Sequence, residues 1–390
     1  MNFKLDKKSL RNLFILLGST LSVMQGALIT PALTNIANQF QDTNNIVFLS
    51  KLIIAIPPIF IALFSPISSI LFDKYGRKPT LIVSAILYGI AGSSGYFAGN
   101  IYILLIGRAL MGISIAGLMT GFIVLIGDLF QDKKDMNKFI GLQGAVMSFG
   151  GVFYLILGQY LVNISWNIPF VAYLFSIIIA VGLLFCLEEP SNTIRKIKNT
   201  LDNTNNKSFI SVHLTALFLM MVYLMIPTQI PFILQEITHQ SNPNVGLYIS
   251  IWILFSSIFS IIYSKIKYFN SYYKAFAISF IIWGIGYIII FLSPNTLTMI
   301  LGLILSGIAN GIAIPNVKAL ILDMADSNQR SKQSGFLTMS LYIGQFLSPI
   351  IMEPIIQLSS TKMPFLLIGI IFLILSPIFF QKVNQQKNIS

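Results

Sequence analysis

The chain has 390 residues, of which 55% are hydrophobic and 10% charged, and its mean hydropathy is +0.80. Soluble globular proteins carry about 25% charged residues, so this composition excludes that class and indicates a polytopic membrane protein. The formal net charge is +12, and its distribution along the chain decides whether it indicates nucleic-acid binding.

Twelve apolar runs are long enough to cross a bilayer, since a transmembrane helix needs about 20 mainly apolar residues. Backbone groups in hydrocarbon must be paired within the segment, so the runs are expected to be helices. The first run has no small-residue cleavage site behind it and is interpreted as a retained helix. The sequence therefore predicts an all-α polytopic membrane protein with helices at 12–35, 46–72, 80–98, 101–127, 139–162, 166–187, 209–234, 245–264, 275–293, 296–317, 335–358 and 363–380.

Basic residues gather on one side of this predicted topology. With the N-terminus inside, 22 of the 25 Lys and Arg residues fall in or beside inner segments, while Lys51 and Lys362 fall outside and Arg108 within a helix. Because Lys and Arg collect in cytoplasmic loops, both termini are predicted to be cytoplasmic. The net positive charge then comes from basic residues that face anionic lipid head groups on the cytoplasmic side, and it does not indicate nucleic-acid binding. The abundance of Ile, Asn and Lys is consistent with an AT-rich bacterial genome, and the expected location is the bacterial inner membrane.

The longest polar stretch, residues 188–208, follows the sixth predicted helix. It predicts an N-terminal six-helix half at 1–187, a cytoplasmic linker at 188–208 and a C-terminal six-helix half at 209–390. Paired halves are typical of secondary transporters, although no clear sequence repeat relates these two.

A charged loop, SILFDKYGRK at 69–78, joins the second and third predicted helices. Asp73, Gly76, Arg77 and Lys78 match the signature loop of the major facilitator superfamily, which this segment resembles. Ser69 of this chain stands where the family's pattern has a glycine. The resemblance covers essentially the whole chain and implies twelve helices in the major facilitator fold.

The same loop has a direct physical interpretation. Gly76 can take a positive φ at a sharp turn without strain. Asp128 ends the fourth predicted helix on the same side, so Arg77 can pair with Asp73, with Asp128 or with both. The resemblance implies that Asp73, Gly76, Arg77, Lys78 and Asp128 form a cytoplasmic gate. The alternative is that the basic residues are ordinary anchors on the cytoplasmic side.

Arg108 is the one basic residue deep in a predicted helix. Burying it costs at least about 2.5–3.5 kcal/mol, so it is expected to face the protein interior and to have a partner. Arg108 and Gly112 resemble the family's fourth-helix motif, which implies that Arg108 biases a nearby proton site. Alternatively, its side chain snorkels to the outer surface.

Glu353 is the one acidic residue well inside a predicted helix. It is a candidate for proton coupling, with access to water near the helix end as the alternative. The fifth predicted helix resembles the antiporter motif at Gly141, Gly150 and Gly158, but Tyr154 and Leu155 replace the expected Gly-Pro pair. Because small residues let helices approach closely, helix packing explains these glycines equally well.

Uncharged polar side chains within the predicted helices are candidates for contact with a substrate. Pro227 and Pro231 flank one of them, Gln229, and broken helices are tolerated where they line a cavity. Each candidate has an interhelical hydrogen bond as its alternative role. The candidates are Gln25, Gln143, Tyr154, Tyr223, Gln229, Asn310 and Gln345.

The chain lacks the sequence features of several other classes. Its single cysteine, Cys186, excludes an internal disulfide framework and a cysteine-rich metal site. No HExxH or GxxxxGK[ST] motif occurs, so neither an enzyme nor direct use of ATP is expected. We expect no cofactor, no metal and a monomer.

These patterns and the resemblance together predict a secondary active transporter that works by alternating access. The expected activity is proton-coupled efflux of small lipophilic or drug-like molecules. The alternative is export or import of a specific anionic metabolite such as a carboxylate siderophore. The expected partners are a small-molecule substrate, protons and the lipid bilayer.

Overall fold

The computed structural model describes residues 7–130, 132–189, 206–240, 243–265, 271–325 and 330–387. Within these ranges the regular structure is helical throughout. Twelve helical segments there are long and apolar enough to cross a membrane. The predicted all-α fold with twelve spans is therefore confirmed, whereas most of the predicted linker, residues 190–205, lies outside the described residues.

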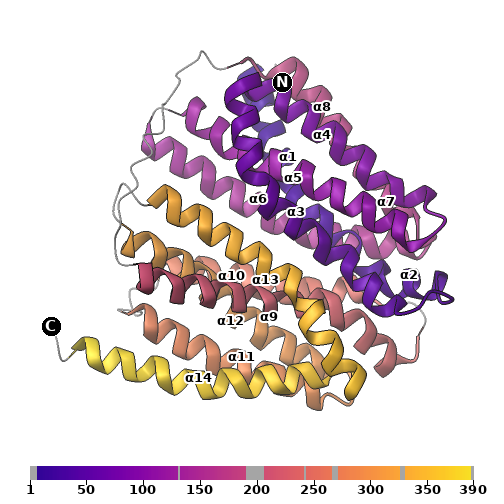
Figure 1. Ribbon diagram of the computed structural model, residues 1–390, viewed down its shortest axis with the longest axis vertical. Helices are drawn as coiled ribbons and strands as arrows, with labels where there is room; N and C mark the ends of the chain where they lie inside the picture. Colours follow the sequence, from indigo (N-terminus) through magenta and orange to yellow (C-terminus); the bar gives the residue numbers. More distant parts are fainter. Residues whose placement is uncertain are drawn as a thin grey trace, which may run out of the picture. The chain divides into compact units, whose positions relative to one another are not determined.

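The chain divides into two compact units, Met1–Asn199 and Thr200–Ser390. Figure 1 labels the α-helices of both units. The first unit contains α1 (Lys7–Ala27), η1 (Thr30–Ala32), α2 (Leu33–Gln39), α3 (Ile46–Tyr75), α4 (Arg77–Ser93), η2 (Ser94–Phe97), α5 (Ile101–Leu129), α6 (Lys133–Val162), α7 (Ile168–Val171), η3 (Ala172–Leu174) and α8 (Phe175–Cys186).

Two of the predicted helices are interrupted in this unit. The first run ends as α1 at Ala27 and continues through η1 into α2. Pro31 lies in η1, where its missing N–H prevents an unbroken hydrogen-bond ladder. Likewise, the run predicted at 166–187 begins as α7, with Pro169 at its start, and passes through η3 into α8.

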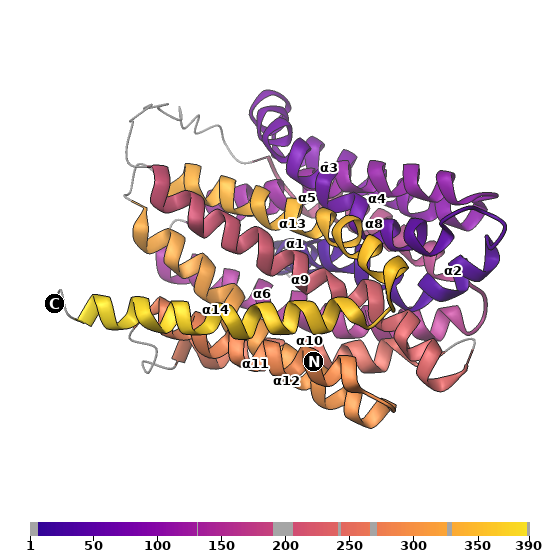
Figure 2. The same ribbon diagram turned by 60° about the horizontal axis from the view of Figure 1, so that its bottom comes forward.

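The second unit contains α9 (Asn206–Thr238), α10 (Val245–Lys265), α11 (Tyr272–Leu292), α12 (Thr296–Met324), α13 (Arg330–Leu358) and α14 (Met363–Lys387). Pro227 and Pro231 lie inside α9, which continues through both of them. Figure 2 shows α14 running alongside α11, and these two helices are in extensive contact.

The same pairs of helices pack together in each unit. In the first, α1 packs on α6, α3 and α4 pack on α5, and α4 packs on α8. In the second, α9 packs on α13, α10 and α11 pack on α12, and α11 packs on α14. The two units therefore have the same internal arrangement, with α1, α4 and α5 equivalent to α9, α11 and α12.

Equivalent hydrogen bonds support this repeat. The Tyr88 hydroxyl of α4 donates to the Leu21 carbonyl of α1 at 2.8 Å, and the Tyr287 hydroxyl of α11 donates to the Val222 carbonyl of α9 at 2.8 Å. The equivalent helices α5 and α12 each begin after an asparagine whose side chain accepts a backbone N–H at 3.0 Å. The repeat thus exists in the contacts although no sequence repeat is evident.

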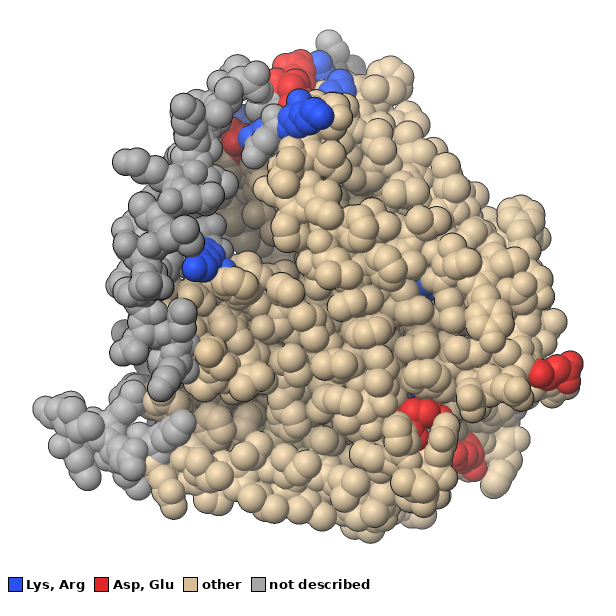
Figure 3. Space-filling view, in the orientation of Figure 1, with Lys and Arg blue, Asp and Glu red and all other residues tan. Residues whose placement is uncertain are grey.

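The outer surface suits hydrocarbon. Large apolar side chains such as Ile123, Phe149 and Leu297 are exposed. On the face shown in Figure 3, uncharged side chains form a broad area and most of the charged groups lie near its margins. A lipid-facing surface of this kind is what a multi-pass membrane protein needs, because the bilayer core solvates apolar groups only.

Two glycines of α6 provide a matched test of helix packing. A methyl group at Gly158 would overlap the Leu28 carbonyl oxygen, whereas one at Gly141 would meet nothing within 4 Å. We expect Gly158→Ala to destabilise the protein by about 1–3 kcal/mol through overpacking. Gly141→Ala is expected to be neutral or stabilising by up to about 1 kcal/mol. Thermal melting in detergent measures both, and equal melting temperatures for the two variants would contradict the close packing of α6.

Candidate functional site

The signature loop is a sharp turn between α3 and α4. Gly76 has a φ of 93°, a conformation that glycine adopts without strain, and its N–H donates to the Phe72 carbonyl at 3.1 Å. Arg77 then begins α4. Gly76 therefore allows α4 to begin immediately after α3 ends.

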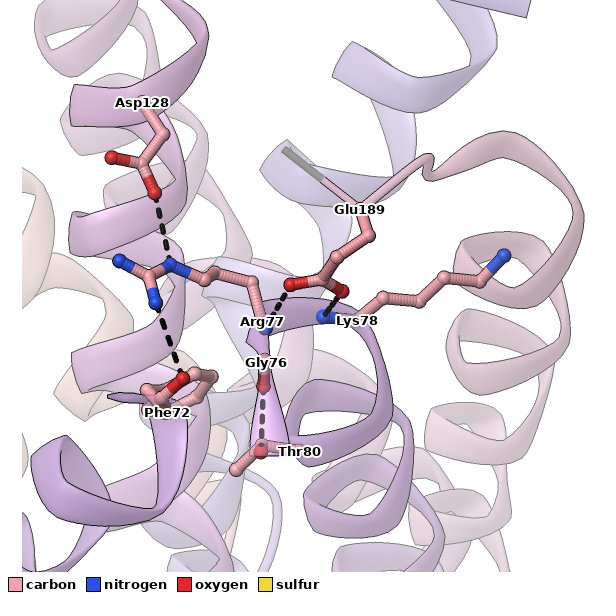
Figure 4. A network of polar contacts seen from close by, with 7 residues as sticks. All are labelled: Phe72, Gly76, Arg77, Lys78, Thr80, Asp128 and Glu189. Carbon is pink, nitrogen blue, oxygen red and sulfur yellow. Dashed lines mark hydrogen bonds and ion pairs between the residues drawn. The ribbon is translucent and has the colours of Figure 1, made fainter. Parts of the chain in front are cut away.

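This turn brings Arg77 and Asp128 together (Figure 4). Arg77 Nε donates to Asp128 Oδ2 at 3.0 Å, and Arg77 Nη1 donates to the Phe72 carbonyl at 3.2 Å. Both side chains are partly exposed, so the pair contributes at most about 1 kcal/mol. The side chain of Asp73 lies outside the described part of the structure.

Glu189 joins this group, which the sequence alone did not suggest. Its carboxylate accepts the backbone N–H of Arg77 at 2.5 Å and that of Lys78 at 2.8 Å (Figure 4). These are orphan donors of the first turn of α4, and a carboxylate there also favours the helix dipole. The start of the polar segment after α8 is thereby held on the signature loop.

The neighbouring Glu188 contacts the start of α1. Lys7 Nζ donates to Glu188 Oε1 at 2.6 Å. This hydrogen bond and the Lys7 charge lower the pKa of the Glu188 carboxyl. The contact therefore stabilises the fold above the ordinary glutamate pKa and is lost as the pH falls through the lowered value.

The second unit has a neutral counterpart of the Arg77–Asp128 pair. Asp323 lies next to the end of α12, as Asp128 does in the equivalent α5. Tyr272, at the start of α11, forms a hydrogen bond with Asp323. The Tyr272 carbonyl accepts from Asn316 Nδ2 at 3.0 Å. A tyrosine thus occupies the role that arginine has in the first unit.

Arg108 lies inside α5 and is 1% exposed, so its guanidinium does not reach the outer surface. Its Nη1 donates to the Gln25 carbonyl at 3.2 Å, to the Tyr173 hydroxyl at 3.1 Å and to Met111 sulfur at 3.1 Å. The guanidinium carbon also lies 5.1 Å from the ring centre of Phe170 and 4.7 Å from that of Tyr173. All of these partners are neutral.

The aromatic cage around Arg108 was not predicted from the sequence. Tyr173 and Phe170 lie in an apolar run whose ring directions depend on the break between α7 and α8. Tyr173 also donates to the Gln25 carbonyl at 3.0 Å, which fixes its hydroxyl beside Arg108. The cage leaves two buried atoms, Arg108 Nη2 and Gln25 Oε1, without a hydrogen-bond partner.

Gly112 has a packing role in the same helix. A methyl group there would come within 2.6 Å of the Pro57 carbonyl oxygen and 2.8 Å of Phe60 Cβ. The motif glycine therefore lets α3 and α5 approach each other closely, one turn from Arg108.

Candidates on α6 bond to α1. Gln143 Nε2 donates to Ser19 Oγ at 2.6 Å, and the hydroxyls of Tyr154 and Thr20 share a hydrogen bond of 2.7 Å. Gln143 and Tyr154 therefore form hydrogen bonds between helices, which is the alternative to substrate contact stated for them above. Tyr154, at the position where the antiporter motif has Gly-Pro, lies in a helix that contains no proline.

Candidates in the second unit are less well satisfied. Gln229 is fully buried, and neither its Oε1 nor its Nε2 has a partner. Asn310 Nδ2 donates to Ser256 Oγ at 2.7 Å while its Oδ1 has no partner. Gln345 makes a long contact to Met220 sulfur at 3.5 Å, and Tyr223 packs on Trp252.

Two other charged side chains are buried in the spans. Glu353 of α13 is 8% exposed, so the flanking prolines do not open it to water, and Lys51 of α3 is fully buried. Burying charge in hydrocarbon is costly, which makes intramembrane ionisable residues functional candidates.

The twelve long apolar helical segments of the described residues define a multi-pass membrane protein. The family model of the Major Facilitator Superfamily matches residues 15–266 and 212–388. The chain belongs to this superfamily.

Curated relatives of the chain include resistance and export proteins. The chain is 28% identical to the tetracycline resistance protein, class H, of Pasteurella multocida over 63% of this chain and 58% of that protein. It is 33% identical to the bacillibactin exporter of Bacillus subtilis over 32% of each chain, and 24% identical to multidrug resistance protein 1 of the same organism over 48% of this chain and 47% of that protein. The chain thus spans less than two thirds of each relative.

Solved structures match over almost the whole chain. A bacterial homolog of the human lysosomal transporter Spinster, inward-facing and occupied, has a TM-score of 0.80 at 16% identity, covering 97% of both chains. The D-xylose-proton symporter has a TM-score of 0.81 at 14% identity, covering 96% of this chain and 97% of that one. At these identities the likeness shows the fold alone.

Gly76→Ala tests the conformation of the signature loop. A Cβ at this residue would lie 2.7 Å from Glu189 Oε1, and the positive φ adds strain. We expect a loss of about 1–3 kcal/mol together with faster hydrogen exchange of the Arg77 and Lys78 amides. Gly127→Ala, where nothing lies within 4 Å of the added methyl, is the control. Unchanged exchange at both amides in Gly76→Ala would contradict the capping role of Glu189.

Gln229→Leu separates structure from function in α9. Removing a buried amide with no partner is expected to stabilise the protein by about 1–2 kcal/mol. If Gln229 contacts substrate, the same change lowers transport. Thr228→Val is the control, because the Thr228 hydroxyl is satisfied by the Leu224 carbonyl at 2.7 Å. A more stable variant with undiminished transport would remove Gln229 from the substrate contacts.

Proposed function

We infer that this chain is a bacterial inner-membrane transporter that exports small lipophilic or drug-like molecules in exchange for protons. The chain has two six-helix halves, 1–187 and 209–390, joined by a cytoplasmic linker. Movement of the halves opens the substrate site in turn to each side of the membrane. Both termini lie in the cytoplasm, as the positions of the basic residues favour, and the transporter works as a monomer. The names of the relatives, which include tetracycline and multidrug resistance proteins, support export of drug-like compounds.

The observation that carries the proposal is the buried charge of Arg108. Its contacts in the first unit are neutral, so they leave its positive field uncompensated in a medium of low dielectric constant. Such a field lowers the proton affinity of any nearby group and promotes proton release when substrate or an opening motion brings them together. Glu353, buried in α13, is the candidate proton carrier.

The candidates for substrate contact are the polar side chains with buried atoms that lack a hydrogen-bond partner. Gln25, Gln229 and Asn310 each keep at least one unsatisfied buried atom. Tyr223 and Gln345 remain candidates with a ring contact and a weak sulfur contact. Gln143 and Tyr154, whose polar groups bond to α1, contribute mainly to helix packing.

The signature loop serves as the cytoplasmic gate. Arg77 pairs with Asp128, and Glu189 holds the first turn of α4, which includes Lys78. Surface ion pairs are worth about 1 kcal/mol or less, so several of them can hold a closed state and still release it. Asp73 is proposed as a further partner of Arg77.

One observation favours a second candidate function, transport of a specific anionic metabolite. Arg108 has a free Nη2 donor and no acidic partner among the described residues of its unit. A substrate carboxylate would neutralise the charge and accept that donor. The resemblance to the bacillibactin exporter is compatible with such a substrate.

Proteoliposomes with an imposed pH gradient distinguish the two functions. We expect gradient-driven efflux of lipophilic dyes by the wild-type protein, with a loss of tenfold or more in Arg108→Ala, since hydrogen bonds of a charged group are worth about 1.5–3 kcal/mol. A smaller loss is expected in Asp73→Asn, since an ion pair near the surface is worth about 1 kcal/mol or less. Gln143→Leu, which changes a packing contact, serves as the control. Transport of a carboxylate that needs Arg108 but ignores the gradient would replace the first function by the second.

A further inference from the structure

We propose that Tyr223, Trp252 and Asn310 form a contact site for planar aromatic substrates that carry both a hydrogen-bond acceptor and a donor on their edge. The inference rests on the proposed transport function and deepens it by naming the class of substrate. Trp252 was not among the candidates that the sequence suggested.

The three residues come from three helices of the second unit. The ring centres of Tyr223 in α9 and Trp252 in α10 are 4.9 Å apart, with their planes at 50°. Trp252 lies against α12 at Gly307, where an added Cβ would come within 2.6 Å of the Trp252 carbonyl oxygen and 3.3 Å of its Cδ1. The absence of a side chain at Gly307 therefore allows the indole to pack directly on α12.

Asn310 lies one turn beyond Gly307 on α12. Its Nδ2 donates to the hydroxyl of Ser256, which lies one turn beyond Trp252 on α10, at 2.7 Å. The indole and the amide thus occupy successive turns of the same α10–α12 contact. The amide is held in place by Ser256, and its oxygen remains free to accept a hydrogen bond.

The site has an unused donor and an unused acceptor. Trp252 is 1% exposed and Asn310 5% exposed, and neither Trp252 Nε1 nor Asn310 Oδ1 has a partner. Buried polar groups in proteins are nearly always satisfied by protein, water or ligand. A substrate with an acceptor facing the indole N–H and a donor facing the amide oxygen would satisfy both.

The depth of these residues fits a substrate site. Tyr223 and Asn310 lie near the middle of α9 and α12, and secondary transporters bind substrate near the bilayer midplane. Tyr223 is the partly exposed member, and its ring offers a flat face for stacking or edge contacts. The chemistry selects a fused or planar ring system with polar groups along one edge.

Tetracycline, a linear four-ring compound with a flat conjugated part and with hydroxyl and carbonyl groups along one edge, is the probe for equilibrium binding to the purified full chain in detergent. Trp252→Phe keeps the aromatic ring and removes the N–H, and Asn310→Leu removes the amide. We expect each to weaken binding about five- to tenfold, the effect of one lost hydrogen bond. Trp283→Phe is the matched control, because this equally buried indole also has an Nε1 without a hydrogen-bond partner but stacks on Phe372 in the core, 5.1 Å between ring centres, and its loss should leave binding unchanged.

Unchanged affinity in Trp252→Phe overturns the proposed site, and so does a wild-type protein that does not bind tetracycline. If Asn310→Leu does not fold, as judged by its melting curve, Trp252→Phe alone decides. Binding in detergent requires no pH gradient. Intact binding without gradient-driven transport therefore contradicts the proposed proton coupling and leaves the contact site standing.

Discussion

Polar atoms inside a bilayer have no water to bind, so each must be satisfied by the protein or by a molecule that the protein admits. This constraint explains why all twelve spans are helical. It also explains the hydrogen bonds between helices, such as those from Tyr88 and Tyr287 to backbone carbonyls of a neighbouring helix. Buried polar atoms without a partner are the exceptions to this rule, and they are the candidates for contact with a ligand.

The sequence predicts the fold well because hydropathy alone reports helix number in a membrane. About 20 apolar residues are needed for each crossing, and the twelve runs coincide with the twelve spans in the described residues. The breaks at Pro31 and Pro169 were missed, because a short 3-10 turn keeps the run apolar and changes only the hydrogen-bond ladder. The repeat was missed for a related reason, since it is a property of contacts and not of residue identity.

The site was predictable only in part. The order of the predicted helices placed Arg77 and Asp128 on the same side of the membrane, because each helix crosses it once. Glu189 is separated from Arg77 by 112 residues in sequence, and no local pattern links them. Tyr173 and Phe170 are likewise ordinary members of an apolar run until the fold turns their rings toward Arg108.

Equivalent helix ends are joined in both units, but by different side chains. In the first, a charged pair between Arg77 and Asp128 ties the start of α4 to the end of α5. In the second, Tyr272 bonds to Asp323 at the equivalent helix ends. A neutral phenol needs less desolvation than a guanidinium. The contact in the first unit is therefore the one that is more sensitive to salt and to nearby charge.

Some of the residues with unsatisfied buried atoms lie on equivalent helices of the two units. Gln25 and Gln229 lie on the equivalent helices α1 and α9, and Arg108 and Asn310 lie on the equivalent helices α5 and α12. These residues lie at different positions along their helices, because the equivalent hydrogen bonds align Gln25 with Ile226 and Arg108 with Leu303. The first unit has a buried charge, Arg108, whereas the second has neutral amides and an indole. An anionic group would therefore suit the unsatisfied atoms of the first unit, and a flat uncharged group those of the second.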